Sequence, residues 1–322
     1  MTRISALTIA SGRENHLKNV IKGFQQQNHP VDELIIGVMQ PDDYTDLPET
    51  DFIVRQINLS RADLCLAAAR NTVADAATGD VLMFVDVDCI PAPDFVATYL
   101  DRMQGRHGLF MGEVQYLPDG ATQNGLDFDH FNRVSVRHSD RQGPPAAGIA
   151  PCPDYRCFWS LNFAMHRSDW ETCPRFDERF TGYGGEDTDF GRNLSDADIP
   201  IWWIKGGRVF HQYHPHYMPP VHHMESVMRN ADLFAEKWGH RTMEHWLYAF
   251  QLMGLIRNDP DGLTVLRQPV QADFDLCAQQ SDMPYANTRR VIDALQNDPE
   301  LSAKRAAQVE RDQSTFLLPA AE

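Results

Sequence analysis

Residues 78–88 run Thr78-Gly79-Asp80-Val81-Leu82-Met83-Phe84-Val85-Asp86-Val87-Asp88. The unbroken apolar run at 81–85 is typical of a strand buried on both faces of a sheet. Asp86 and Asp88 follow at the end of that strand, which in open α/β sheets is the end where ligands bind. Carboxylates are costly to bury unless something pairs with them. The two aspartates therefore indicate a site for a divalent cation that binds together with a nucleoside diphosphate. The alternative is capping of the helix expected from residue 93, but Asp94 already supplies that cap.

Strand and helix patterns alternate through the first third of the chain. Such alternation predicts a parallel, doubly wound α/β sheet. Strand-like runs lie at 4–10, 34–39, 52–59 and 81–85, and helical spacing of apolar residues fills 17–24 and, after a cap at Ser60, 64–73. Further on, strands are expected at 109–116, 160–166, 201–204 and 209–212, helices at 93–104, 127–136 and 186–194, and a helical pattern from residue 221 to the end.

Composition limits the partners. The 322 residues carry a formal net charge of −16, with a pI near 5.2. This acidity argues against nucleic acid and against docking on anionic lipid, since both need a basic surface. No run approaches the roughly 20 apolar residues that span a bilayer, and no signal peptide is expected. The six cysteines are scattered without metal-finger spacing, so we expect reduced thiols and a cytoplasmic protein.

A second acidic cluster follows two glycines, in Tyr183-Gly184-Gly185-Glu186-Asp187-Thr188-Asp189. The glycines allow unusual backbone torsions or movement. Acids at a helix start are favoured by the helix dipole, so capping is the alternative interpretation, and one acid is expected to do only that. Three acids exceed what capping needs, and one can act as a general base on a hydroxyl group. Tyr183 could present an aromatic face to a sugar ring.

A third cluster is Phe210-His211-Gln212-Tyr213-His214-Pro215-His216. If these residues form a strand, His211 and Tyr213 share one face and Gln212 and His214 the other. Imidazole binds Mn²⁺ and Zn²⁺ more readily than Mg²⁺, so a site with two aspartates, one histidine and a diphosphate would suit Mn²⁺.

Together these runs resemble a known family. Residues 68–71 and 79–88 resemble the nucleotide-sugar half of the GT-A glycosyltransferases, and residues 176–189 resemble their acceptor half. The later run is similar to the C-terminal motif of animal β-galactosyltransferases and polypeptide N-acetylgalactosaminyltransferases, and to bacterial family-2-like enzymes. The resemblance extends from Ile4 to His216. It implies a GT-A doubly wound mixed sheet with helices on both faces, in a domain at 1–240 (donor half 1–116, acceptor and catalytic half 117–240), followed by a helical extension at 241–322.

The resemblance also implies roles for individual residues. Asp86, Asp88 and His211 would hold the cation, Mn²⁺ or Mg²⁺. Asp187 would be the catalytic base, and Glu186 would orient the acceptor or donor. After the first strand, where galactosyltransferases have a proline and two arginines, this chain has Ser11-Gly12-Arg13-Glu14. The donor-binding set implied is Ser11, Arg13, Asp42, Arg61, Arg70, Asp86, Tyr183 and Gly185.

The resulting expectation is a metal-dependent, inverting transfer of a sugar from a nucleoside-diphosphate sugar, with UDP favoured, to a hydroxyl acceptor such as a carbohydrate. Residues 118–157, long and rich in Gly and Pro, and the Gly184-Gly185 hinge would close over the donor and exclude water. Two alternatives stay open. One is a nucleotidyltransferase on a related fold, and the other is a non-catalytic protein that binds sugar nucleotides.

Overall fold

The computed structural model describes residues 2–59, 65–259, 262–279, 283–285, 287–299, 303, 306–307 and 309–311. Internal contacts divide the chain into two compact units. The first, here called the sheet unit, holds the chain up to Gly182 together with Glu186–Tyr213. The second, the helical unit, holds Tyr183–Gly185 together with the chain from His214 onward. The sequence places the domain boundary later, after residue 240, whereas the contacts divide the chain after Tyr213 because the helix that follows packs with the C-terminal elements.

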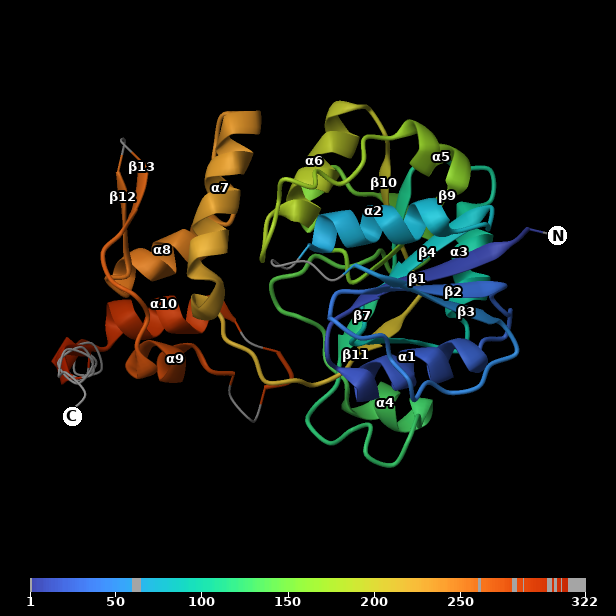
Figure 1. Ribbon diagram of the computed structural model, residues 1–322, viewed down its shortest axis with the longest axis horizontal. Coiled ribbons are helices and arrows are strands. Elements are labelled where there is room, and N and C mark those ends of the chain that lie inside the picture. Colours follow the sequence, from blue (N-terminus) through green and yellow to red (C-terminus); the bar gives the residue numbers. More distant parts are fainter. Residues whose placement is uncertain are drawn as a thin grey trace. The chain divides into compact units, whose positions relative to one another are not determined.

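Within the described residues, the sheet unit contains an eight-stranded sheet in the order β3-β2-β1-β4-β9-β6-β10-β8 (Figure 1). β1, β2, β3 and β4 run parallel, β9 runs antiparallel to β4 and β6, and β8 runs antiparallel to β10. The sheet is therefore mixed, as the resemblance predicts. The strands are β1 Ile4–Ala10, β2 Glu33–Val38, β3 Ile53–Asn58, β4 Val81–Val85, β6 Leu109–Met111, β8 Ile149–Pro151, β9 Asn162–His166 and β10 Ile201–Ile204.

Helices cover both faces of this sheet, as expected. Figure 1 shows α2, α5 and α6 on one side and α1 on the other. The core beneath α2, α5 and α6 is rich in aromatic rings: Phe84 and Phe163, opposite each other on β4 and β9, stack with centroids 4.2 Å apart. The helices are α1 Glu14–Gln25, α2 Leu66–Ala76, α3 Phe95–Met103, α5 Arg167–Thr172 and α6 Glu186–Asp196.

A small second sheet, in the order β5-β11-β7, leads away from the end of β4. Its strands are β5 Cys89–Pro91, β11 Val209–His211 and β7 Val114–Tyr116. The single strand predicted at 109–116 is wrong, since it divides into β6 in the large sheet and β7 in the small one. The division falls at Gly112-Glu113, where the Glu113 carbonyl accepts from the amide of Val209 at 2.9 Å and its buried carboxylate accepts from Gly206 at 3.2 Å.

Residues 118–157, predicted to close over the donor, contain regular structure. They include α4 Phe128–Val134, β8 and the short 3-10 helix Tyr155–Cys157. Phe131 of α4 is fully buried against Phe210 of β11, and residue 136 bridges to Tyr116. Residues 118–127 and 137–148 of this segment form no helix or strand.

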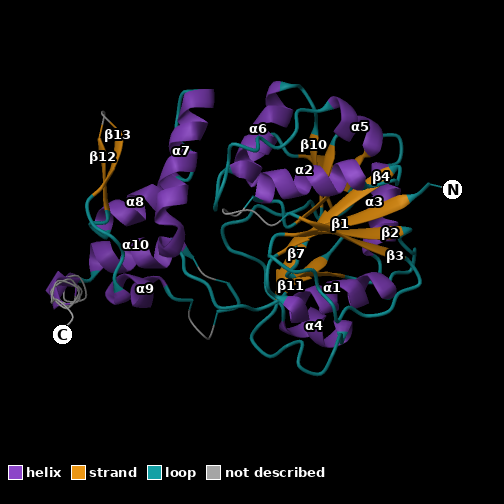
Figure 2. Ribbon diagram, in the orientation of Figure 1, coloured by secondary structure: helices purple, strands orange, loops and turns teal. Residues whose placement is uncertain are grey.

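The helical unit is built around α7 Met224–Trp238 and α8 Glu244–Leu252, with α9 Gln271–Cys277 and α10 Thr288–Asn297. The apolar stripe of α7, including Val227, Ala231 and Phe234, is buried. The expectation of helix to the end of the chain is wrong, because β12 Ile256–Asp259 and β13 Gly262–Val265 form an antiparallel hairpin (Figure 2). Across the residues that the structure describes, no helix is long and apolar enough to cross a membrane. All six cysteines are buried.

Candidate active site

The acidic triplet forms the turn where the chain leaves the large sheet for the small one. Pairing of β4 ends at Val85, the amide of Asp86 donates to the carbonyl of Leu161 at 3.0 Å, and the amide of Cys89 closes a turn on the carbonyl of Asp86 at 2.9 Å. β5 then begins at Cys89. The two carboxylates are thus fixed at the end of a buried strand by backbone hydrogen bonds on both sides.

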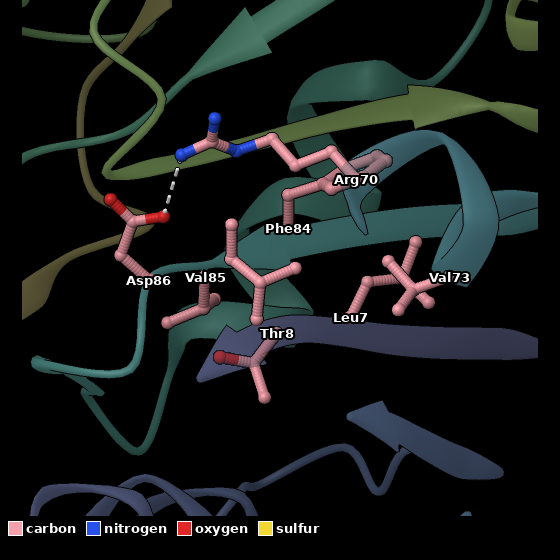
Figure 3. A pocket seen from close by; sticks show the side chains of 8 residues that line it. Leu7, Thr8, Arg70, Val73, Phe84, Val85 and Asp86 are labelled. Carbon is pink, nitrogen blue, oxygen red and sulfur yellow. Dashed lines mark hydrogen bonds and ion pairs between the residues drawn. The ribbon is translucent and has the colours of Figure 1, made fainter. Parts of the chain in front are cut away.

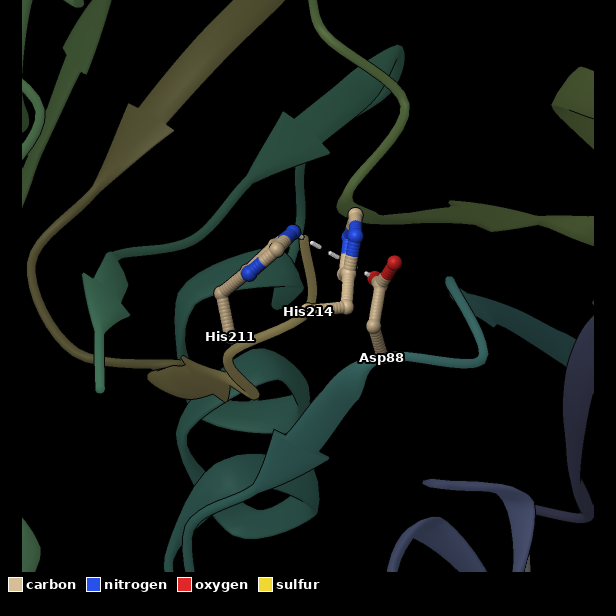
Figure 4. Close-up of side chains that lie close together, drawn as sticks. All are labelled: Asp88, His211 and His214. Carbon is tan, nitrogen blue, oxygen red and sulfur yellow. Dashed lines mark ion pairs between the residues drawn. The ribbon is translucent and has the colours of Figure 1, made fainter. Parts of the chain in front are cut away.

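Asp88 and His211 meet because β5 pairs with β11. His211 lies opposite Cys89, and the amide of Gln212 donates to the carbonyl of Asp88 at 2.6 Å. The His211 Nε2 lies 3.6 Å from the Asp88 Oδ1 (Figure 4), and both residues are buried. The ring of Tyr116 on β7 stacks on the imidazole with centroids 4.7 Å apart, which fixes its orientation.

These two side chains fit a divalent cation. A carboxylate oxygen and an imidazole nitrogen, each able to serve as a ligand, suit an ion such as Mn²⁺. His214, the third residue drawn in Figure 4, belongs to the helical unit. Asp86, predicted as a further metal ligand, forms an ion pair with an arginine of α2.

Arg13 also contacts Asp88. It precedes α1 in a left-handed conformation (φ 48°), and its guanidinium forms an ion pair with the Asp88 carboxylate. Ser11 and Asp42, both predicted to bind the donor, are exposed in the turns after β1 and β2. Arg61, predicted from the resemblance, and the cap expected at Ser60 lie outside the described residues.

Arg70 joins the two acidic clusters. Its side chain is 5% exposed on α2. Nη2 lies 3.3 Å from Asp86 Oδ1, and Nη1 lies 3.1 Å from Glu186 Oε1 at the start of α6. Arg70 and Asp86 also line a small pocket together with residues of β1 and β4, including Thr8 and Val85 (Figure 3). One buried guanidinium therefore holds side chains from distant parts of the sequence at one place.

Burial shifts the ionisation of the acids around this arginine. The pKa of Asp187 is raised to about 7, first by burial and then by the neighbouring Glu186 charge, while Arg70 opposes both. Burial also raises the pKa of Asp86, with Arg70 opposing and Asp88 adding to the increase. A carboxyl group with a pKa near neutral is suited to take a proton in that pH range.

The third acid of the second cluster has a structural role. Asp189 is fully buried, and its Oδ2 accepts from Asn193 Nδ2, one helical turn on, at 3.1 Å. This is the acid expected to serve only the helix. Asp187 is less buried, and its Oδ1 accepts from the amide of Thr188 at 2.7 Å. Tyr183 and Gly185 belong to the helical unit.

The sequence did not indicate two of these contacts. It did not show that Tyr116 covers His211, or that Arg70 pairs with acids rather than facing a ligand alone. The available signal was composition, because Arg70 is the one charged residue among the alanines of residues 66–71. Its neighbour Asn71 adds to the same link, donating from Nδ2 to the carbonyl of Phe176 at 2.9 Å and to Glu178 Oε1 at 3.1 Å.

Comparison with known proteins points to glycosyl transfer. Residues 5–167 match glycosyl transferase family 2, and residues 150–215 match the N-terminal domain of galactosyltransferase. Validoxylamine A glucosyltransferase of Streptomyces hygroscopicus subsp. jinggangensis (strain 5008) is 34% identical over 205 residues, or 53% of this chain and 44% of that protein. Chondroitin synthase of Pasteurella multocida (strain Pm70) is 24% identical over 172 residues, or 47% and 18%. The chain thus spans less than half the length of these curated relatives.

The fold has a counterpart among solved structures. The crystal structure of GalNAc-T7 with UDP, GalNAc and Mn²⁺ matches with a TM-score of 0.51 at 12% sequence identity, covering 66% of this chain and 44% of that one. At this identity the likeness shows the fold alone. It confirms the GT-A architecture that the sequence predicts.

Proposed function

Because the chain belongs to glycosyl transferase family 2, we propose that it transfers a sugar from a nucleoside-diphosphate sugar, with UDP favoured, to a hydroxyl group of an acceptor. The observation that carries this proposal is the meeting of the two acidic clusters. Asp86, beside the cation ligand Asp88, and Glu186, beside the base Asp187, bind the same buried guanidinium of Arg70. A donor held at the first cluster would have its reacting carbon within reach of a base in the second.

In the proposed reaction the acceptor oxygen attacks the anomeric carbon while the bond from that carbon to the diphosphate breaks. The electron pair of the broken bond leaves with the nucleoside diphosphate, and Asp187 accepts the proton of the attacking hydroxyl group. A single displacement inverts the anomeric configuration. Glu186, held by Arg70, orients the acceptor or donor. Asp88 and His211 would hold Mn²⁺ or Mg²⁺, which when bound neutralises the diphosphate leaving group.

The raised pKa of Asp187 supports its assignment as the base. With a pKa of about 7, the side chain is a carboxylate above neutral pH and accepts a proton more readily than an ordinary aspartate does. Turnover at saturating donor should therefore rise with pH through about 7 and then level off. Residues 118–157 and the Gly184-Gly185 hinge remain the segments proposed to exclude water from the donor.

The test begins with the donor. Thermal unfolding is measured with UDP-, GDP- and dTDP-sugars, with and without Mn²⁺, because a ligand that binds only the folded state raises the midpoint. Nucleoside diphosphate release is then followed with a panel of hydroxyl acceptors. Stabilisation by no sugar nucleotide would contradict the proposal. Pyrophosphate release from a nucleoside triphosphate and a sugar phosphate would instead favour a nucleotidyltransferase.

Substitutions in α6 then test the base. Asp187→Asn should lower turnover by about 10²–10⁴-fold, the usual effect of losing a general base, while the KM for the donor stays unchanged. Asp196→Asn, at the exposed end of the same helix, is the matched control and should act like the wild type. If Glu186→Gln is inactive while Asp187→Asn turns over normally, the base is Glu186. If both variants remain active, the cluster only caps the helix.

A further inference from the structure

The turn that precedes the proposed catalytic acids is anchored on helix α7. The amide of Tyr183 donates to the Oγ of Ser226 at 3.1 Å, and the Nδ2 of Asn230 donates to the carbonyl of Gly184 at 2.8 Å. Ser226 and Asn230 lie one turn apart on α7, and they bind the peptide groups on either side of the bond between Tyr183 and Gly184. Gly185 is then joined directly to Glu186, where α6 begins.

Side-chain packing holds the same turn on its other side. Gly184 and Gly185 have φ of +91° and +90°, a conformation that favours glycine. A Cβ added to Gly184 would lie 2.7 Å from the Sδ of Met243 and 3.1 Å from the Cζ3 of Trp246, so helix α8 and the residue before it leave no room for a side chain. The Tyr183 ring stacks on His223 with centroids 4.9 Å apart.

Asn230 is unusual for its position. It is 1% exposed on the apolar face of α7, between the buried Val227 and Ala231. Burying an amide is unfavourable unless its hydrogen-bonding groups are used. The polar group at this position is therefore explained by its bond to the turn rather than by packing of the helix.

We propose that Asn230 is a positioning residue for the reaction, acting through the turn Tyr183–Gly185 that leads directly into Glu186. This inference rests on the proposed function of Glu186 and Asp187. By fixing the carbonyl of Gly184, Asn230 limits the torsional freedom of the two glycines that lead into those acids. Without that bond the glycines can rotate, and the base is no longer held at a constant distance from the acceptor.

The experiment compares three variants of the full chain. Asn230→Ala removes the amide group that hydrogen-bonds to the Gly184 carbonyl, together with its volume. Asn230→Asp keeps the shape of the side chain, but its carboxylate cannot donate a hydrogen bond to that carbonyl. Val227→Ala shortens a buried side chain of the same helix, 0% exposed, that makes no hydrogen bond to the turn, so it reports general loss of stability. Amide hydrogen exchange of the peptide covering 183–189 is measured for each, together with kcat and the KM for the donor.

Both Asn230 variants should exchange faster in this peptide than Val227→Ala does. They should lose about 10- to 100-fold in kcat, the scale expected for misplacing a catalytic group by about 1 Å, with the donor KM unchanged. Exchange at the wild-type rate, a normal kcat, or an equal kcat loss in Val227→Ala would overturn the inference. If the wild-type protein transfers no sugar, the proposed function fails, and the exchange comparison still decides whether Asn230 anchors the turn.

Discussion

Arg70→Gln should be among the most destabilising single substitutions in the sheet unit. The guanidinium is 5% exposed and lies 3.3 Å from Asp86 and 3.1 Å from Glu186. Removing one partner of a buried ion pair leaves the other charge uncompensated and costs about 3–5 kcal/mol. Glutamine keeps helix propensity but carries no charge, so we expect a loss of at least about 3 kcal/mol, or roughly 6–12 °C in the midpoint for a unit of this size.

Arg175→Gln is the matched control. Arg175 lies closer to its partner, 2.6 Å from Asp75, but the two side chains are 36% and 61% exposed. Exposed ion pairs contribute about 0–1 kcal/mol because water and salt screen them. The comparison therefore tests burial rather than distance as the origin of the effect. Urea unfolding measures the loss of stability in both variants, and an unchanged m-value shows that only stability has changed.

The difference in the free energy of unfolding between Arg70→Gln and the wild type should also depend on pH. Arg70 lowers the pKa of both Asp86 and Asp187 against the effect of their burial, so its removal raises both values. When folding raises the pKa of a carboxyl group, the folded protein loses stability as pH rises above the pKa that the group has in the unfolded chain. The deficit of Arg70→Gln should therefore grow as pH rises above about 6, where Asp86 and then Asp187 ionise in the wild type but stay protonated in the variant. A deficit equal to that of Arg175→Gln, or one that shrinks as pH rises, would refute this reasoning.

Three further substitutions test other parts of the sheet unit. Burial alone would raise the pKa of Glu33, but hydrogen bonds from Ser5 and Thr78 lower it to about 2. Glu33→Gln should thus lower the free energy of unfolding by about 3 kcal/mol at pH 7. Urea unfolding should show this difference disappearing as pH falls from about 5 to 2. Asp88→Asn should weaken Mn²⁺ binding at least tenfold by titration calorimetry, an effect at least as large as the roughly 10–100-fold seen for outer-shell changes, and unchanged affinity would exclude Asp88 as a ligand. Gly112→Ala should lower the unfolding midpoint sharply, since its Cβ would lie 2.0 Å from the Gly207 carbonyl oxygen. A wild-type midpoint would show that the backbone at Gly207 can move away at little cost.

The sequence predicts the fold best where apolar runs are unbroken. The bounds of β1, β4 and β10 are those expected from 4–10, 81–85 and 201–204. The prediction fails at 109–116, where the apolar pattern continues but the buried carboxylate of Glu113 draws the chain into a second sheet. It also fails at the β12–β13 hairpin, which pattern alone does not separate from the helices around it. Both failures arise where tertiary hydrogen bonds or pairing override local periodicity.

For the site, the sequence identifies residues but not their pairing. Asp88 and His211 were expected at one cation because of their residue types, and the structure brings them together through the pairing of β5 with β11. No pattern specifies that pairing, because β11 is three residues long. The bond between Arg70 and Glu186 depends in the same way on how α2 packs near α6, which spacing along the chain does not encode.

The charges of the site link cation binding to donor binding. Its carboxylates, Asp86, Asp88, Glu186 and Asp187, outnumber the guanidinium groups of Arg13 and Arg70. A nucleoside diphosphate alone adds negative charge to a site already negative, whereas a divalent cation compensates both. Each ligand should therefore tighten the other, and thermodynamic linkage requires the same factor in both directions, typically about 5–150-fold. Calorimetry of UDP with and without Mn²⁺, and of Mn²⁺ with and without UDP, measures the two ratios. Ratios near one would contradict this reasoning and would mean that no cation is needed to bind the donor.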